Sequence, residues 1–294
     1  MPSLRTPWLS LAVAFVTCEW GCEWGGSTDA TGNLSVPDAH ATVDARKQLD
    51  ASPPVDATPS PDAAIGHTHL LLTEVTLTPT GAEFIELTNV ASAPVELTHY
   101  YLSDNGNYFK LPAGLPAIGQ DDFIVQFPAG ATIAPGGVVT IATGTAAAFT
   151  TAYGAPPTYS IADATMIATT TRGTPSLTDA GEIVVLFTWD GTSSLVQDVD
   201  MLLAGKPTAL NGLVSKSGYV QGPSTYAMDL DTLANQAATP ATGVSTKRIA
   251  SESGHETQAG TGNGIFGDDE TSEATLVTWD TAFTAPTPGH IPPL

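Results

Sequence analysis

Short apolar runs, rather than long periodic ones, organise the chain from Leu70 onward. They are rich in Val, Ile, Thr, Phe and Tyr, and clusters of Gly, Pro, Asn and Asp separate them, which is the pattern of β-strands joined by turns. Within Glu83–Asn89 the alternation places Ile85 and Leu87 on one face, so we expect these two side chains in the core of a half-buried antiparallel strand. The clearest expected strands are Leu70–Leu77, Glu83–Asn89, Phe123–Phe127, Val138–Ala142, Glu182–Thr188 and Leu195–Asp200.

Turn residues between these runs support the same interpretation. Pro135-Gly136 and Asp190-Gly191 are typical of tight turns. Helical periodicity is weak, and Ala146–Tyr153 and Tyr226–Gln236 are each expected to form a turn or two at most. The sequence therefore predicts an all-β fold, and several short strands at this spacing favour a sandwich.

The first 26 residues predict an export leader. The apolar run Trp8–Val16 has nine residues, which fits the core of a signal peptide and is far below the roughly 20 residues of a membrane-spanning helix. Cys18 follows at once, and the arrangement resembles a bacterial lipoprotein signal. We therefore expect lipidation at Cys18. The alternative is an ordinary cleaved signal in which Cys18 and Cys22 have no role.

Residues 27–66 are predicted to be a disordered acidic linker. They are rich in Ala, Pro, Asp, Thr and Ser, they lack aromatic residues, and an Asp-Ala pair recurs every six residues from Asp38 to Asp62. Such a segment cannot bury enough apolar surface to offset the entropy of ordering, about 1–2 kcal/mol per residue. We expect it to hold the domain 67–294 away from its anchor, and we expect 205–275 within that domain to be irregular or inserted.

Several motifs in the predicted sandwich resemble those of the lamin tail domain family. The resembling segments are Leu71–Val75, Glu83–Asn89, Pro94–Thr98, Tyr101–Asp104, Thr132–Val139, Leu177–Leu186, Trp189–Gly191, Ser245–Arg248, Trp279 and Thr287–Gly289. The resemblance implies an immunoglobulin-like β-sandwich of the kind found in nuclear lamins and in exported bacterial proteins. The chain has no coiled-coil heptads, and its leader favours the exported relatives. The family has no shared catalytic residues, so the resemblance implies a fold and a loose role in attachment.

Composition and charge exclude some functions. The 294 residues contain 30 acids and 9 bases, which gives a net charge of −21. From His67 onward there are 22 acids and 6 bases, so the domain itself carries a charge of −16. Nucleic-acid binding needs clustered bases, and we therefore expect none. Both cysteines lie in the leader, which leaves no thiol nucleophile and no disulfide between sheets.

Acidic clusters are the first candidates for a metal site. Ca²⁺ takes six to eight oxygen ligands, but no EF-hand spacing is present. The alternatives are a weak Ca²⁺ site and a solvated acidic surface, and the high net charge favours the second. The acids concerned are Asp268, Asp269, Glu270 and Glu273 in one loop, and the pairs Asp198 with Asp200 and Asp229 with Asp231, each of which would share a face if extended.

The histidines have no spacing typical of a zinc site, and exposed loop positions are expected for them. A surface metal contact is conceivable only at His67 and His69, which lie two residues apart. The full set is His40, His67, His69, His99, His255 and His290.

Other motifs predict no catalysis. Gly262–Gly267 matches a dinucleotide-binding fingerprint, but no apolar strand precedes it and three acids follow, so we interpret it as a chance match in a glycine-rich loop. There is no serine-nucleophile motif. Glu83 and Glu86 would point to opposite faces of a strand, which rules them out as a glycosidase pair. Five aromatic residues could form either a binding surface or core packing: Trp189, Trp279, Tyr100, Tyr101 and Tyr108.

The sequence thus predicts an exported, non-enzymatic surface protein without cofactors. It would display a lamin-tail-like sandwich for adhesion, scaffolding or binding of a protein or cell-envelope partner, and it would meet the membrane only through Cys18. One alternative is a secreted metal-dependent hydrolase with its site in 205–275. Another is a structural module that Ca²⁺ stabilises.

Overall fold

Two five-stranded sheets, each built mainly from the strands expected above, form the fold in a computed structural model of the chain. The structure describes residues 70–179, 181–205, 214–229, 243–252, 255, 262–280, 282, 284–291 and 294. All of these belong to one compact unit, Ala57–Leu294. The predicted leader with Cys18 and the predicted linker 27–66 lie outside the described residues.

The first sheet has the strand order β14-β1-β2-β7-β8, and all its pairs are antiparallel except β7 with β8. Its strands are β1 (Leu70–Thr76), β2 (Phe84–Asn89), β7 (Val138–Ala142), β8 (Tyr159–Ser160) and β14 (Thr246–Lys247). Glu74 of β1 pairs in register with Glu86 of β2 and with Lys247 of β14. The chain therefore returns to its first strand after more than 150 residues.

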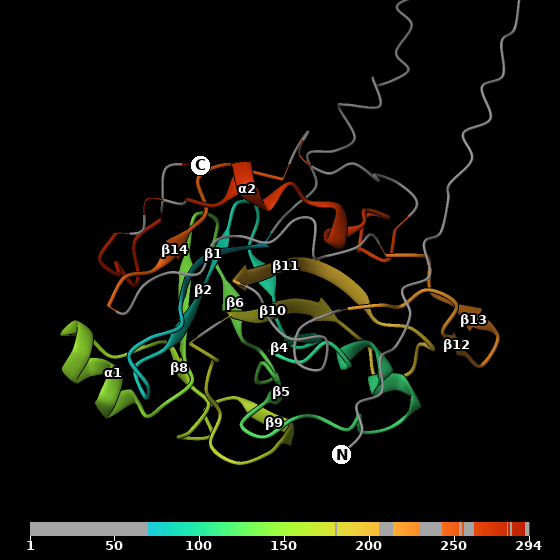
Figure 1. The fold of residues 1–294 in the computed structure, drawn as a ribbon, viewed down its shortest axis with the longest axis horizontal. Helices are drawn as coiled ribbons and strands as arrows, with labels where there is room; N and C mark the ends of the chain where they lie inside the picture. Colours follow the sequence, from blue (N-terminus) through green and yellow to red (C-terminus); the bar gives the residue numbers. More distant parts are fainter. Residues whose placement is uncertain are drawn as a thin grey trace, which may run out of the picture. The chain divides into compact units, whose positions relative to one another are not determined.

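The second sheet has the order β11-β10-β4-β5-β9 and is antiparallel throughout. Its strands are β4 (Tyr100–Ser103), β5 (Phe123–Gln126), β9 (Ile167–Thr171), β10 (Gly181–Thr188) and β11 (Gln197–Gly205). Two small antiparallel pairs complete the strands: β3 (Val95–Glu96) with β6 (Thr132–Ile133), and β12 (Val220–Gln221) with β13 (Ser224–Thr225). Figure 1 shows the elements in this arrangement.

The main core lies between the two sheets. Ile85 and Leu87 of β2 are fully buried there, which confirms their predicted positions, and Leu186 and Leu202 contribute from the second sheet. This packing defines an all-β, immunoglobulin-like sandwich, as predicted.

The prediction that β2 is half-buried was wrong, because all six of its residues are buried. On the outer face, Phe84 packs edge to face against Phe149 and Tyr153 of helix α1 (Ala146–Tyr153). Further along the same face, Glu86 accepts a hydrogen bond from the backbone of Gly289. Segments distant in sequence cover a face that local alternation marks as exposed.

The outer face of the second sheet carries a second apolar core. Phe187 and Met201 from the sheet pack there with Tyr108 and Phe109 of the 3₁₀-helix η2 (Tyr108–Ala113) and with Tyr226. Residues 214–229 thus cover the outer face of the second sheet. The remaining described elements are the 3₁₀-helix η4 (Glu270–Ser272) and the short helix α2 (Thr275–Thr278).

Local sequence chemistry explains the ends of these elements. Thr145 caps α1 by accepting a hydrogen bond from the Ala148 N–H, and the helix ends at Gly154 in the left-handed conformation, as expected for this two-turn segment. Gly136 has a φ of +65° in the turn before β7, which confirms the predicted Pro-Gly turn. Within the described residues, no helix has the length and apolar character needed to cross a bilayer.

Candidate functional site

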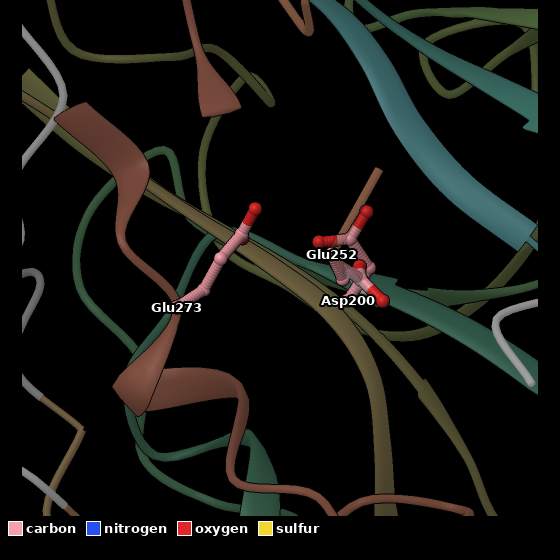
Figure 2. A group of neighbouring side chains, drawn as sticks. All are labelled: Asp200, Glu252 and Glu273. Atoms are coloured by element: carbon pink, nitrogen blue, oxygen red, sulfur yellow. The ribbon is translucent and has the colours of Figure 1, made fainter. Parts of the chain in front are cut away.

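Three carboxylates converge on one fully buried arginine near the edge strands β11 and β14. The oxygens of Asp200, Glu252 and Glu273 lie within 4.8 Å of one another (Figure 2). Arg248 Nη2 donates to both Asp200 oxygens at 2.7 and 2.9 Å, and its Nη1 donates to Glu273 Oε1 at 2.6 Å. Glu252 Oε1 lies 3.6 Å from Nη2. We call these four residues the Arg248 centre.

Neighbouring groups fix the Arg248 guanidinium in place. Its Nε donates to the Leu72 carbonyl at 2.8 Å, and the guanidinium carbon lies 4.9 Å from the centre of the Trp279 ring. Asp200 Oδ2 also accepts from the Leu72 N–H at 2.6 Å. The centre therefore joins β1, β11, the end of β14 and the segment around α2 through charge-assisted hydrogen bonds.

The acids of this centre share a low-dielectric space. Burial raises the pKa of Asp200 to about 6, against the lowering effect of Arg248, and Glu273 raises it further. Burial alone would lower the pKa of Arg248, but the surrounding carboxylates raise it above its ordinary value. The arginine therefore stays charged, and its interactions are those of a buried ionic cluster.

The interpretation of the 268–273 acids as a solvated surface was wrong for three of them. Asp269, Glu270 and Glu273 are buried, and only Asp268 is partly exposed. Glu273 is buried because Arg248 neutralises it, and Asp269 Oδ1 accepts from the backbone and hydroxyl of Thr271. The Asp200 and Glu273 oxygens that Ca²⁺ would use in the Arg248 centre already accept hydrogen bonds from the guanidinium, so Arg248 is the cation of the centre.

Asp198 and Asp200 do not share a face, contrary to the sequence prediction. The β10–β11 register pairs Phe187 with Asp198 and Leu186 with Asp200, and it skips Val199. This β-bulge inserts one residue, so two acids that alternation would place together point to opposite faces of the sheet. Asp200 points toward the main core and Asp198 toward the second core.

Asp198 belongs to a second buried centre, built on Lys216. Lys216 is fully buried, and its Nζ lies 2.5 Å from Asp198 Oδ2, 3.2 Å from Asp229 Oδ1 and 2.9 Å from the Tyr108 hydroxyl. Tyr108 donates to Asp198 Oδ1 at 2.6 Å. Asp229 also accepts from the Lys216 N–H at 2.5 Å and from Asn263 Nδ2 at 3.0 Å. We call these five residues the Lys216 centre. Asp231, the predicted companion of Asp229, lies outside the described residues.

Burial dominates the electrostatics of the Lys216 centre. It raises the pKa of Asp198, although Lys216 acts in the opposite direction. Burial would lower the pKa of Lys216, but attraction to Asp198 and Asp229 raises it above its ordinary value. Lys216 therefore holds its proton, and burial favours the protonated form of Asp198.

The glycine motif at 262–267 forms a tight loop beside this centre. A Cβ at Gly262 would clash with the Asp268 carbonyl oxygen, and Gly264 bridges to Asp198 of β11. Glycine is required because two backbone segments approach closely. The motif therefore packs a loop against the edge of β11.

Glu74 and Glu86 hold the C-terminal segment on the outer face of the first sheet. Glu74 accepts from the Thr287 N–H at 3.0 Å and from its hydroxyl at 3.1 Å, and it also accepts from Ser245. Glu86 accepts from the Gly289 N–H at 2.6 Å, and burial raises its pKa to about 7. Glu83 instead accepts from Thr143 at 2.9 Å. The sequence-based exclusion of a Glu83–Glu86 pair is consistent with these separate partners.

The described aromatic residues and histidines singled out from the sequence are either packed in the core or located in loops. Trp279, Tyr108 and Tyr101 are buried, and the Tyr101 ring stacks on Phe187 with centroids 5.2 Å apart, so these three belong to the core. Trp189 and Tyr100 are half-buried. Among the histidines, His99 and His290 are exposed and His255 is partly exposed, whereas His40, His67 and His69 lie outside the described residues.

An open pocket of about 600 Å³ lies beside the Lys216 centre. The β10–β11 loop, the β13 segment and the glycine loop form its walls. None of its lining residues carries a charged side chain, although the chain as a whole has a net charge of −21. The lining residues are Ser193, Ser194, Leu195, Val196, Gln197, Ser224, Thr225, Tyr226, Ala227, Gly262, Asn263 and Gly264.

The pocket is suited to uncharged polar groups. Gln197 and Thr225 are exposed at its rim, whereas the Tyr226 hydroxyl is engaged in the wall, donating to the Phe109 carbonyl and accepting from the Val196 N–H. The side chain of Asn263 bonds Ala227 and Asp229. The pocket thus combines a wall fixed by hydrogen bonds with hydroxyl and amide side chains at its rim, which are suited to hydrogen bonds with an uncharged ligand.

The two packed sheets define an immunoglobulin-like β-sandwich, and residues 64–201 match the family model of the Lamin Tail Domain. The match supports that family for this segment, in agreement with the sequence motifs between Leu71 and Gly191, and the motifs from Ser245 onward lie outside the match. It ends within β11, so Lys216, Arg248 and the glycine loop lie beyond it.

Among solved structures, a DUF4876 family protein from Bacteroides thetaiotaomicron VPI-5482 is similar to the chain. The sequence identity is 13%, the TM-score is 0.36, and the likeness covers 77% of this chain and 72% of that one. No curated protein matches the sequence.

Sequence reasoning missed both buried bases. Arg248 lies in a segment singled out for its family motif, and Lys216 lies in the stretch expected to be irregular. The composition contained one indication of these centres. From His67 onward there are only 6 bases and 22 acids, so a base next to a predicted strand is a candidate partner for several buried carboxylates.

Proposed function

We propose that the chain is an exported, non-enzymatic surface protein that presents its lamin-tail-like sandwich to a cell-envelope partner. The leader and the acidic linker predicted from the sequence support export and display, with Cys18 as the expected lipid attachment site. The Lamin Tail Domain match at 64–201 fits a non-enzymatic β-domain.

The uncharged pocket at 193–197, 224–227 and 262–264 is the observation that carries this proposal. A surface with strong negative charge repels anionic partners, so an uncharged hollow within it selects a neutral polar group. Loops at one end of a rigid sandwich are the usual positions for recognition. The partner therefore inserts an uncharged polar segment between the β10–β11 loop and β13.

Five of the described carboxylates in and beside 205–275 are paired with a buried base, which favours this function over a hydrolase that would use them. Asp200, Glu252 and Glu273 are closed around Arg248, and Asp198 and Asp229 are closed around Lys216. Both bases are fully buried. An acid that is saturated by a buried cation has no lone pair directed at a substrate or a metal-bound water.

Binding to envelope material from the protein's own cells tests the proposal. The purified full-length chain would be compared with Gln197→Lys and Thr225→Lys, which place a charge at the pocket rim. Ala147→Lys is the matched control, because Ala147 is exposed on α1, and α1 and the β12–β13 pair lie on opposite sides of the view in Figure 1.

The two rim variants should weaken binding by about tenfold or more, while Ala147→Lys binds like the wild type. Equal binding by all four proteins would contradict the pocket as the recognition site. Absence of binding by the wild-type chain would contradict a cell-envelope partner.

A further inference from the structure

We propose that Lys216 and Asp198 condense to an intramolecular amide bond that covalently joins β11 to the segment 214–229. Lys216 Nζ and Asp198 Oδ2 are 2.5 Å apart, and the two side chains are 0% and 1% exposed. No other lysine of the described residues is held in this way. Lys110 bonds Asn107 and Lys247 bonds Thr284 and Ala285, and both are at least partly exposed.

The surroundings favour the amide over the ion pair. Nζ lies 5.3 Å from the centre of the Tyr108 ring, and Tyr108 belongs to the apolar core formed with Phe187, Val214 and Tyr226. Removing two charges from water carries a large penalty, which attraction between them only partly repays. Condensation converts the Lys216 ammonium and the Asp198 carboxyl group into a neutral amide. The fixed geometry also makes the reaction unimolecular, with a high effective concentration of amine at the carboxyl group.

The Lys216 centre supplies the acid–base partner that the reaction needs. Asp229 Oδ1 lies 3.2 Å from Nζ, and this carboxylate is held by the Lys216 N–H and by Asn263. Its side chain is 2% exposed. Three donors orient Asp229 with Oδ1 toward Nζ, so it is the carboxylate placed to take a proton from the ammonium.

Tyr108 is placed to stabilise the charge that develops on the carboxyl group. Its hydroxyl donates to Asp198 Oδ1 at 2.6 Å, on the oxygen that remains in the amide. When the amine attacks, negative charge accumulates on that oxygen, and a preorganised donor lowers the barrier. The same hydroxyl accepts from Nζ at 2.9 Å, which keeps the nucleophile beside its target.

The reaction balances without an oxidant or an activating group. It starts from the Lys216 ammonium, protonated Asp198 and ionised Asp229. Asp229 takes one proton from Nζ, and the free amine attacks Asp198 Cγ to form the Nζ–Cγ bond. Asp229 then returns a proton to Oδ2 and takes another from the nitrogen, so that the Cγ–Oδ2 bond breaks and water leaves. The products are a neutral amide, one water and a protonated Asp229.

The bond would have a clear structural consequence. It closes a ring between the edge strand β11 and the segment that carries β12, β13 and the pocket wall. The outer layer of the second sheet could then not detach from the strand when the domain is pulled or heated. This inference does not depend on the proposed binding function.

Tryptic peptides of the denatured full-length protein test the bond directly. Between Arg172 and Lys247 trypsin can cut only after Lys216, because Lys206 precedes a proline. A free Lys216 releases peptide 173–216. An amide at Lys216 blocks cleavage and leaves one peptide, 173–247, that is about 18 Da lighter than its sequence because one water is lost.

We expect the lighter peptide in the wild-type protein, with fragmentation suppressed between residues 198 and 216. Release of peptide 173–216, or an uncut peptide of full mass, would overturn the proposal. Suppressed fragmentation between residues 216 and 229 would overturn the assignment to Asp198.

Variants then test the roles of the individual residues. Asp229→Asn keeps the shape of the proton acceptor and should release peptide 173–216. Tyr108→Phe should form the bond at least about tenfold more slowly after synthesis. Lys110→Arg is the control and should retain the lighter peptide. If Asp229→Asn forms the bond as completely as the wild type, Asp229 is not the proton acceptor.

Discussion

Arg248 meets Asp200 in a two-bond contact, although 48 residues separate them in sequence and both side chains are fully buried. Asp200 lies inside the segment that matches the Lamin Tail Domain, and Arg248 lies outside it. The contact therefore fastens the C-terminal part of the chain to the sandwich core. Arg248 also binds the Asp200 oxygens that a metal-dependent hydrolase would need at this position.

Removing the arginine should destabilise the protein strongly. Arg248→Met leaves Asp200, Glu252 and Glu273 buried together without their cation, and breaking a buried pair in this way costs about 3–5 kcal/mol. Urea unfolding measures the change. Arg172→Met is the control, because Arg172 is exposed and its loss should change stability by no more than about 0.5 kcal/mol. Similar small effects in both variants would contradict a structural role for the centre.

The pH dependence of stability should reveal two buried glutamates. Burial raises the pKa of Glu86 and of Glu182 from 4.5 to about 7. Between these values the folded protein binds more protons than the unfolded chain does, so the free energy of unfolding contributed by these groups falls as pH rises from 4.5 to 7. Above pH 7 their contribution no longer changes.

The double variant Glu86→Gln/Glu182→Gln should lose this part of the pH dependence. Relative to the wild type, it should therefore gain stability between pH 5 and pH 7.5 in urea unfolding measurements. The comparison between the two pH values cancels the hydrogen bonds that either substitution weakens. An identical difference from the wild type at both pH values would show that the two glutamates ionise normally in the folded protein.

Calcium should leave the melting temperature of the wild-type protein almost unchanged. The Arg248 guanidinium already fills the space between the three carboxylates, and a cation at the same oxygens would be repelled. We expect a shift of less than about 2 °C between excess Ca²⁺ and EDTA. A rise of many degrees would instead support the Ca²⁺-stabilised module.

The C-terminal segment should contribute through its contact with Glu74. Thr287→Val removes the hydroxyl that bonds Glu74 Oε2 and keeps the side-chain shape. The expected loss is about 0.5–1.5 kcal/mol, because the contact is only partly buried. Thr151→Val on α1 is a matched control, since the Thr151 hydroxyl bonds a carbonyl of its own helix. Equal effects would mean that the segment is not held by this bond.

Short-range patterns predicted much of the sandwich. Alternation identified Ile85 and Leu87 as core, and the Pro135-Gly136 turn was recognised from residue types alone. The coverage of β2 was not predictable in this way, because Phe149 and Gly289 reach its outer face from 65 and 203 residues away. When a distant segment covers a strand, the alternation of polar and apolar residues along that strand does not reveal it.

The buried centres were harder to predict for the same reason. Strand alternation predicts that Asp198 and Asp200 lie on one face, but the bulge at Val199 places them on opposite faces of the sheet. The partners of Lys216 come from η2, from β11 and from the segment that ends at Asp229. Their convergence is a property of the tertiary fold, although the scarcity of bases among many acids was visible in the composition.

The central claim, that the chain displays its sandwich from a cell surface, is tested most directly at the N-terminus. Mass analysis of the N-terminal peptide of the protein purified from its own cells would measure both the start of the mature chain and any attached lipid. We predict a mature chain that begins at an acylated Cys18. A chain that retains residues 1–17, or one that begins elsewhere without a lipid, would contradict lipid-anchored display.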